Sequence, residues 1–296
     1  MLKVEIAQEI METEVTNQED WSLVIRPQRA WWDLRLGELW RYRDLVWLFV
    51  WRDFVAYYKQ TILGPLWYLI QPILTTLVFT VIFGNIAKLS TDGLPPFLFY
   101  LAGNTVWTYF STCLTSTSNT FVSNSSMFGK VYFPRLSVPI SIVISNIISF
   151  GIRFGLFILF LTYFIAQGSE VRPNAWAFLL PVLLLIMAGI GLGLGIIISS
   201  LTTKYRDLQQ LVGFGVQLLM YGAPVIYPLS SVESKWRWIF LANPMTPVIE
   251  LFRYGFMGVS SLSPMYIFYS IAWMFVVLLI GVLVFNHVES TFMDTV

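Results

Sequence analysis

The side chains that carry most enzyme chemistry are nearly absent from this 296-residue sequence. It holds one cysteine, Cys113, and one histidine, His287. A single cysteine excludes an intrachain disulfide and a cysteine-based zinc cluster, and a single histidine excludes a histidine-rich metal site. The sequence also lacks a G-x-x-x-x-G-K-[S/T] phosphate loop, so we expect no nucleotide site in this chain. These features predict a chain with no catalytic residues, no metal and no cofactor of its own.

Two groups of polar residues could still bind or position a ligand. The run 108–119 is rich in serine and threonine, and buried hydroxyls of this kind need water or a hydrogen-bond partner. Farther along, Glu250 and Arg253 carry opposite charges three residues apart, a spacing that brings them together on one face of a helix. We expect this pair to be structural, because each charge neutralises the other.

The composition indicates which kind of fold holds these residues. The sequence is 56% hydrophobic and only 12% charged, whereas about a quarter of the residues in a soluble domain are charged. A water-soluble fold of this size could not bury so much apolar surface, which excludes soluble enzymes and disordered proteins. The net charge of +1 gives no indication of nucleic-acid binding. The sequence therefore predicts a multi-pass membrane protein.

Apolar runs with few charges are long enough to cross a bilayer at six places, because a spanning helix needs about 20 apolar residues. We therefore predict an all-α integral membrane fold with six transmembrane helices. The first 20 residues are polar and acidic, which argues against a cleavable signal peptide. The predicted parts are a cytoplasmic N-terminal segment (1–37), an interfacial helix (38–60) and a transmembrane domain (61–296) with spans near 65–86, 97–119, 138–166, 176–201, 208–227 and 265–287.

The distribution of positive charge predicts the orientation in the membrane. Segment 1–64 and the loops 120–137 and 202–207 together hold twelve of the 18 Lys and Arg residues, and the opposite face holds five. By the positive-inside rule, the N-terminus lies in the cytoplasm. An even number of spans places the C-terminus there as well.

The segment 38–60 predicts an amphipathic helix that lies in the membrane interface. At about 100° per residue, charged residues from Glu38 to Lys59 fall mainly on one stripe, and Trp and Phe residues fill much of the remainder. This pattern is typical of a helix on the membrane surface, since Arg52, Asp53 and Lys59 would be costly to bury in a span. Its role is either to anchor the chain or to brace a cytoplasmic partner.

The segment 229–263 is too apolar for an ordinary loop and too often interrupted by charges for a span. Its longest uncharged stretch, 238–249, contains Pro244 and Pro247. Irregular backbone of this kind is tolerated at membrane depth where protein or a water-filled cavity covers it. We predict a re-entrant external hairpin between the fifth and sixth spans, with a loose external loop as the alternative.

Several short strings are more specific than this overall pattern. The string Y-K-Q-T-I-L-G-P-L-W occupies 58–67 and joins the interfacial helix to the first span. The strings V-Y-F-P-R at 131–135, Y-R-D at 205–207 and A-P-V-I-Y-P at 223–228 precede or close later spans. Together with Asn243-Pro244 and Arg253-Tyr254, they resemble the ABC-2 type permeases that export polysaccharides, over residues 30–290.

The resemblance implies a function, a location and partners. It implies a homodimer in the bacterial inner (plasma) membrane, two partner ATP-binding subunits that hold ATP and Mg, and an undecaprenyl-diphosphate-linked glycan as substrate. The chain would contact membrane lipid and no nucleic acid. The leading hypothesis is export of lipopolysaccharide O-antigen, and export of teichoic acid or capsule is the alternative. A secondary transporter or an intramembrane glycosyltransferase is disfavoured, because the predicted spans have no Asp or Glu in their middles.

Candidate functional residues follow from the predicted topology and from the resemblance. The 120–137 loop predicts a short helix whose Met and aromatic side chains plug into a groove on a partner, with a simple turn as the alternative. The resemblance implies that this helix couples ATPase movement to the membrane. The candidate coupling residues are Ser126, Met127, Phe128, Lys130, Tyr132, Arg135, Arg206 and Asp207.

A lipid-linked diphosphate needs cations at the cytoplasmic headgroup level, and simple anchoring to lipid headgroups is the alternative role for them. The candidates are Arg41, Arg52 and Lys59. A glycan also needs a pore with hydroxyls and aromatic faces, for which packing and helix–helix hydrogen bonding are the alternatives. The candidate pore and gate residues are Trp107, Thr108, Tyr109, Ser111, Thr112, Thr115, Tyr221, Tyr227, Trp236 and Trp238.

Two further features predict structure rather than ligand binding. The pairs Gly189/Gly193 and Gly191/Gly195 have small-xxx-small spacing, which allows close approach of helices. Arg153 is the one charge deep inside a predicted span. Its expected partner is a backbone carbonyl or a residue of the second copy.

Overall fold

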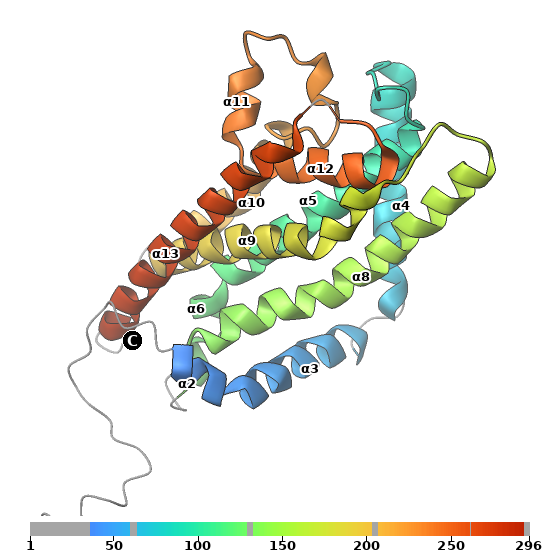
Figure 1. The fold of residues 1–296 in the computed structure, drawn as a ribbon. Coiled ribbons are helices and arrows are strands. Elements are labelled where there is room, and N and C mark those ends of the chain that lie inside the picture. The colour runs from blue at the N-terminus through green and yellow to red at the C-terminus, as the bar shows by residue number, and fades with distance from the viewer. Residues whose placement is uncertain (1–35, 60–63, 129–132, 203–206, 261, 293–296) are drawn as a thin grey trace, which may run out of the picture. The chain divides into compact units, whose positions relative to one another are not determined.

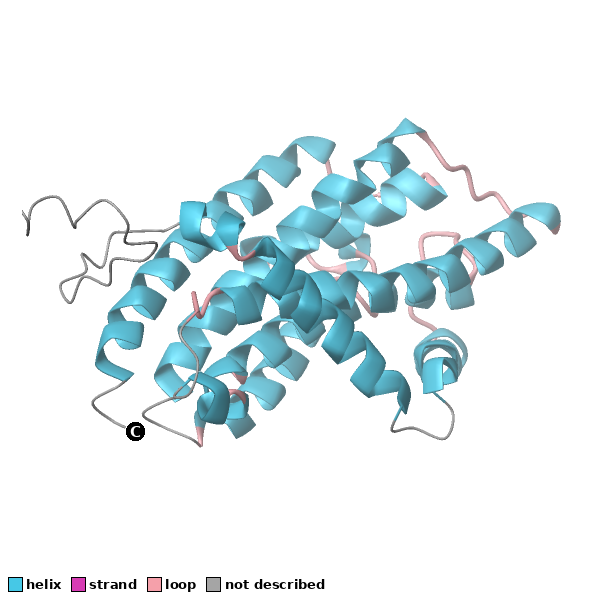
Figure 2. Cartoon of the chain, turned by 90° about the horizontal axis from the view of Figure 1, so that it is seen from below, coloured by secondary structure: helices cyan, strands magenta, loops and turns pink. Residues whose placement is uncertain are grey.

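The computed structural model describes residues 36–59, 64–128, 133–202, 207–260 and 262–292. All regular structure in these residues is helical, which confirms the prediction of an all-α fold (Figures 1 and 2). Most of the predicted N-terminal segment 1–37 lies outside the described residues, and so do the candidates Lys130, Tyr132 and Arg206.

The described helices follow the predicted order closely. A π-helical segment, Thr80–Ile86, extends α4, and 3₁₀ turns at Ala175–Leu179 and Pro264–Tyr266 lead into α9 and α13. The α-helices are α2 (Leu36–Arg41), α3 (Arg43–Lys59), α4 (Trp67–Phe79), α5 (Pro96–Ser118), α6 (Thr120–Ser123), α7 (Ser125–Phe128), α8 (Ser137–Ala166), α9 (Leu180–Thr202), α10 (Leu208–Tyr221), α11 (Arg237–Ala242), α12 (Met245–Met257) and α13 (Ile267–Phe292).

Among the described residues, four elements are long and apolar enough to cross a membrane. They are Trp67–Ile86, Ser137–Ala166, Ala175–Thr202 and Pro264–His287. Helix α5 has 23 residues, but its serines and threonines lower its hydropathy, and α10 has only 14 residues. At 1.5 Å per residue, α10 is roughly 21 Å long, which is shorter than the roughly 30 Å hydrocarbon core of a bilayer.

The predicted fifth helix, 208–227, is too long at its C-terminal end. Helix α10 ends at Tyr221, and the residues after it are irregular because Pro224 has no backbone N–H with which to continue a helix. The side-chain amide of Asn243 donates to the carbonyl of Gly222 (3.1 Å) and holds this irregular segment against the turn between α11 and α12.

Within the described chain, helices α4, α5, α8, α9, α10 and α13 run between two ends (Figure 1). At one end, which we call the α12 end, the loop after α8 bonds α12, the loop after α10 bonds the turn between α11 and α12, and the loop after α4 bonds Ser230 in the segment before α11. At the other, which we call the α3 end, α3, α6, α7 and the C-terminal parts of α9 and α13 share an aromatic cluster. Its rings are Phe49, Phe121, Phe128, Phe133 and Phe285.

Helix α9 lies between α5 and α13 because its glycines let both helices approach closely. A Cβ on Gly193 would lie 2.9 Å from a backbone nitrogen of α13. A Cβ on Gly191 would lie 2.9 Å from the side chain of Cys113 in α5. The pair Gly189/Gly193 therefore faces α13 and the pair Gly191/Gly195 faces α5, which confirms the predicted packing role.

Helix α3 lies alongside α8 (Figure 1). The predicted continuous helix 38–60 is divided at Tyr42 into α2 and α3. One side of α3 is buried, while Trp47, Leu48 and Trp51 on the other side are exposed. Exposed tryptophans are typical of a helix in contact with lipid headgroups.

Candidate functional site

The Ser/Thr-rich part of α5 presents a narrow polar strip. At about 100° per residue, Asn104, Thr108, Ser111 and Thr115 fall within an arc of about 60°. All four side chains are partly exposed, whereas most of the helix is buried by α4, α8, α9, α10 and α12. We call these four residues the α5 strip. It lies on a partly open side of an otherwise covered helix.

The hydroxyls of the α5 strip are satisfied by their own helix. Thr108 Oγ1 donates to Asn104 Oδ1 (3.2 Å), and Ser111 Oγ donates to the Thr108 carbonyl (3.1 Å). Thr115 Oγ1 donates to the Ser111 carbonyl (2.8 Å). Each hydroxyl keeps acceptor capacity, because its oxygen has two lone pairs. The strip can therefore accept hydrogen bonds from water or from sugar hydroxyls while its own protons stay paired.

The other predicted pore residues of α5 point elsewhere. Trp107 and Tyr109 are buried, with 4% and 1% of their surface exposed. The Trp107 ring packs edge-on against Phe110, and the Tyr109 ring packs edge-on against Phe150. These two aromatic rings belong to the hydrophobic core of the subunit. Thr112 lies beside the α5 strip, donates to the Thr108 carbonyl (2.7 Å) and lines a pocket between α5 and α8.

The predicted coupling segment forms two short helices, α6 and α7, at the α3 end. Asn124 lies between them, and its side-chain amide donates to a carbonyl of α6 (3.0 Å). Phe128 is buried, with its ring centre 5.9 Å from that of Phe121 and 5.8 Å from that of Phe133. Phe128 therefore anchors α7 to the subunit, and Met127 beside it is half-buried.

The remaining coupling candidates differ in exposure. Arg135 is buried, and its guanidinium lies 5.6 Å from the centre of the Phe128 ring. Asp207 is exposed directly before α10. The side chain of Ser126, in α7, lies outside the described part of the chain. The structure thus brings Met127, Phe128 and Arg135 together at the α3 end.

The predicted gate residues lie at the end of α10, in the segment that follows it and in α11. The Tyr227 hydroxyl donates to the Tyr221 carbonyl, and the Tyr227 ring packs edge-on against Phe240 at 5.6 Å. Tyr221, Trp236 and Trp238 have exposed side chains. The four candidates therefore share one end of the subunit, and three of them are open to contacts outside it.

Arg253 is the central residue of the α12 end. It is 2% exposed, and its guanidinium lies 3.6 Å from the centre of the Phe99 ring in α5. Nη1 donates to the Pro224 carbonyl (2.5 Å), and Nη2 donates to the Val225 carbonyl (2.8 Å). Nη1 also lies 3.8 Å from Oε1 of Glu250, which confirms the predicted pair. Arg253 thus joins α5, α12 and the irregular segment after α10.

Gly103 leaves the space that this guanidinium occupies. A Cβ on Gly103 would lie 2.8 Å from Arg253 Nη2 and 2.8 Å from the Val225 carbonyl oxygen. The sequence predicted the charge pair but missed the two carbonyl acceptors, which lie 29 and 28 residues from Arg253. The A-P-V-I-Y-P string was the available signal, because a helix interrupted by proline leaves carbonyls without helical partners.

The predicted headgroup cations lie on α2 and α3. Arg41 is exposed. Arg52 pairs with Asp53, with Nη2 2.8 Å from Oδ1, and its guanidinium lies 4.9 Å from the centre of the Phe49 ring. The side chain of Lys59 lies outside the described part of the chain. Arg52 is therefore held by two neighbours on its own helix.

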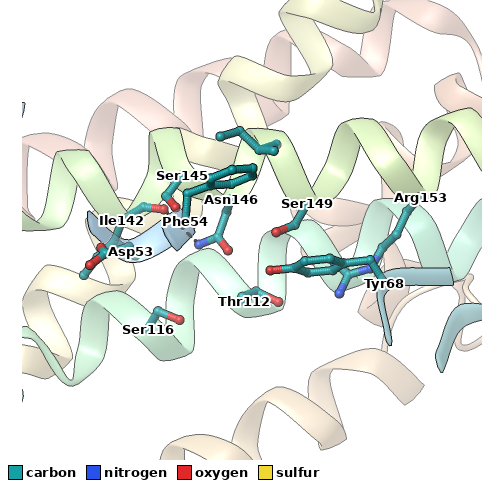
Figure 3. Close-up of a pocket in the computed structure, with 11 residues that line it drawn as sticks. Asp53, Phe54, Tyr68, Thr112, Ser116, Ile142, Ser145, Asn146, Ser149 and Arg153 are labelled. Carbon is teal, nitrogen blue, oxygen red and sulfur yellow. Dashed lines mark hydrogen bonds between the residues drawn. The ribbon is translucent and has the colours of Figure 1, made fainter. Parts of the chain in front are cut away.

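A polar pocket with a volume of about 360 Å³ lies between α3, α4, α5 and α8 (Figure 3). Arg153 lies at one end of it, with its guanidinium 5.6 Å from the centre of the Tyr68 ring. Asp53 lies at the other end. The hydroxyl and amide side chains between these ends are Thr112, Ser116, Ser145, Asn146 and Ser149.

Comparison with known sequences identifies the family to which this architecture belongs. Residues 44–257 match the family described as ABC-2 type transporter, and this match covers more than half of the chain. The chain belongs to the ABC-2 type transporter family. The resemblance that the short strings indicated is therefore confirmed.

Curated relatives of this ABC-2 chain share most of its length. The O-antigen export system permease protein RfbA of Myxococcus xanthus is 30% identical over 218 residues, which are 73% of this chain and 81% of the relative. A protein of the same name from Klebsiella pneumoniae is 26% identical over 256 residues, which are 85% of this chain and 94% of the relative. The inner membrane transport permease YadH of Escherichia coli strain K12 is 22% identical over 203 residues, which are 65% of this chain and 76% of YadH.

Family membership places the chain in a class of transport proteins. As an ABC-2 permease with several apolar helices of spanning length, it is a multi-pass membrane subunit of a transporter. In transporters of this kind, ATP hydrolysis belongs to a partner subunit.

Proposed function

We propose that this ABC-2 permease is the membrane subunit of an ATP-driven exporter of lipopolysaccharide O-antigen. Support comes from relatives at 26–30% identity that are named as O-antigen export permeases. In this proposal the substrate is an undecaprenyl-diphosphate-linked glycan, which crosses the bacterial inner membrane. The partner ATPase holds ATP and Mg, and this chain supplies the path.

The proposed assembly is a homodimer with two ATP-binding subunits. Each copy would cross the membrane six times, with α5 as the second span and α10 as the fifth, and with both termini and the α3 end in the cytoplasm. Helix α10 is short, but irregular backbone can complete a crossing where protein covers it. Helix α3 would lie in the interface with Arg41, Arg52 and Lys59 near the headgroups, and α11 and α12 would form the re-entrant hairpin.

The α5 strip is the observation that carries the proposal. A polar strip that faced hydrocarbon would be unfavourable, whereas one that faces water or a second copy would be satisfied. Two strips brought face to face across a dimer axis would line a path with hydroxyl and amide acceptors, which suit sugar hydroxyls. The exposed rings of Tyr221, Trp236 and Trp238 would add aromatic faces at the external end.

In the same proposal, α6 and α7 receive the movement of the ATPase. Phe128 and Arg135 are buried, so they would transmit a push on α7 into the aromatic cluster of the α3 end. Met127 is half-buried and Asp207 is exposed, which leaves both available for contact with the partner. Fewer residues would therefore contact the ATPase than the predicted set of coupling residues contains.

Export of O-antigen tests the function directly. In a strain that lacks its own copy, the wild-type chain should restore the O-antigen ladder on lipopolysaccharide. The double variant Ser111→Leu, Thr115→Leu should lose most of that ladder, because two leucines replace acceptors and narrow the path. Ile147→Leu, on the exposed side of α8, is the matched control and should export normally. An intact ladder with loss of capsule or teichoic acid would overturn the assigned substrate.

A further inference from the structure

We propose that the pocket between α3, α4, α5 and α8 (Figure 3) binds the phosphate of a lipid headgroup, with Arg153 as the cation that holds it. The proposal rests on the lining of the pocket and on the membrane location of the chain. It does not depend on which glycan is exported.

The pocket brings Arg153 close to the start of α4 and to α3. By sequence this arginine lies in the middle of α8, but its guanidinium packs against Tyr68, the second residue of α4. Asp53 and Phe54 of α3 line the same pocket, so in the proposed topology it lies beside the interfacial helix. Arg153 is only 8% exposed. A buried arginine inside a span is unfavourable in lipid, and such residues commonly mark binding sites.

The side chains around Arg153 can donate hydrogen bonds to a phosphate. Figure 3 shows the Tyr68 ring beside the guanidinium and Ser149 near the Tyr68 hydroxyl. The Thr112 hydroxyl already donates to the Thr108 carbonyl (2.7 Å), so it offers a phosphate no proton. Phosphate oxygens accept several hydrogen bonds at once, and a planar guanidinium can bond two of them in parallel. The hydroxyls of Tyr68 and Ser149 and the guanidinium of Arg153 can therefore act together as donors to one phosphate group.

The rest of the pocket favours an amphiphile over a free anion. Phe54, Ile142 and Ile148 contribute apolar surface to the lining, and the side chain of Ile148 is exposed on the outside of the bundle. A lipid chain could follow this surface while its headgroup reaches Arg153. Asp53 does not oppose an anion, because it lies at the far end of the pocket and its carboxylate pairs with Arg52 at 2.8 Å.

Two lipids carry the required chemistry. One is a bilayer phospholipid with a phosphodiester, and the other is a polyprenyl carrier with a diphosphate. Both present phosphate oxygens next to an apolar chain. The experiment below distinguishes these sources.

Lipid binding to the purified permease complex, measured by native mass spectrometry, tests the proposal. The probes are phosphatidylglycerol, undecaprenyl diphosphate and the phosphate-free lipid diacylglycerol. Arg153→Gln should weaken binding of the phosphate lipids about tenfold or more, since a hydrogen bond to a charged group is lost. Arg153→Lys should have a smaller effect because it keeps the charge. Arg172→Gln, which removes an exposed arginine at the α12 end, is the matched control.

A second variant keeps Arg153 and fills the pocket instead. Ser116→Ile should also weaken the binding of the phosphate lipids. If Arg153→Gln does not fold, the binding measured for Ser116→Ile tests the proposal in its place. A loss of affinity for undecaprenyl diphosphate alone assigns the pocket to the exported carrier. An equal loss of affinity for undecaprenyl diphosphate and phosphatidylglycerol assigns it to bilayer phospholipid as well. Wild-type affinity in both variants, or an equal loss for diacylglycerol, would overturn the proposal. This assay needs no transport, so its failure and a failure of the O-antigen assay are distinguishable.

Discussion

The α12 end and the α3 end of the subunit are held together by different forces. At the α12 end, the guanidinium of Arg253 bonds two distant carbonyls, Asn174 Nδ2 donates to a carbonyl of α12 (2.8 Å), and Ser230 Oγ donates to a carboxylate in the loop after α4 (2.7 Å). At the α3 end, aromatic rings pack together, such as Phe121 stacked on Phe285 at 4.8 Å, and the hydrogen bonds that join the end of α9 to α5 and α6 are between neutral groups (3.2 and 3.4 Å).

This difference indicates how the subunit can move. Hydrogen bonds to a buried charge fix distance and angle, whereas aromatic packing has no single required geometry and tolerates small shifts. In a transporter driven by a partner ATPase, force enters where the partner docks. We therefore expect the α3 end to shift during transport and the α12 end to move as one body.

The largest effect should come from removing the guanidinium at the α12 end. Arg253→Met would leave Glu250 buried without its cation and two carbonyls without a donor. We expect a loss of about 3–5 kcal/mol in stability. Thermal unfolding of the purified subunit measures it, with Arg172→Met as a control on an exposed arginine. Equal midpoints for the two variants would show that Arg253 does not hold this end together.

A matched pair of ring substitutions compares the two ends directly. Phe99→Leu removes the ring beneath Arg253, a cation–π contact worth up to about 2 kcal/mol when desolvated. Phe285→Leu removes one ring of the α3 cluster, which is stacked on Phe121, a pair worth about 0.5–1.5 kcal/mol. The unfolding temperature should therefore fall more in Phe99→Leu than in Phe285→Leu. A larger fall in Phe285→Leu would reverse the comparison.

The smallest effect on stability should come from a substitution on α7 that weakens binding of the partner ATPase. Met127→Glu adds a charge to the half-buried surface of α7 and should reduce copurification of the ATPase, with little change in unfolding temperature. Met265→Glu makes the same change at an exposed position near the α12 end and should leave the complex intact. Full assembly and normal export in Met127→Glu would remove α7 from the docking surface.

The sequence predicted the helices well because apolar length and charge spacing determine spans. The predicted limits of α5, α8 and α9 agree closely with those observed, α4 reaches the predicted limit with its π-helical segment, and α13 continues to Phe292, past the predicted end at 287. The fifth helix was predicted too long, because an apolar run does not show that Gly222 and Pro224 end the helix. The glycines of α9 were interpreted correctly, since small-xxx-small spacing has a direct packing consequence.

The site was harder to predict, because side-chain direction depends on tertiary neighbours. Trp107 and Phe128 were expected at a pore and at a docking surface, but both are buried, since other helices cover that side of each residue. Ser111 and Thr115 share one partly open face, which helical spacing alone could have separated from Thr112. The pocket around Arg153 depends on α3, α4, α5 and α8 together, and no local pattern indicates it.

Accessibility of the α5 strip tests the central claim most directly. In a Cys113→Ala background, the single variants Thr108→Cys, Ser111→Cys and Thr115→Cys are exposed to a charged, membrane-impermeant thiol reagent in the assembled transporter. Ala102→Cys, at a fully buried position of the same helix, is the control. Our account predicts that all three strip positions react in at least one state of the ATP cycle and that the control does not. Protection of all three in every state, together with normal export, would contradict it.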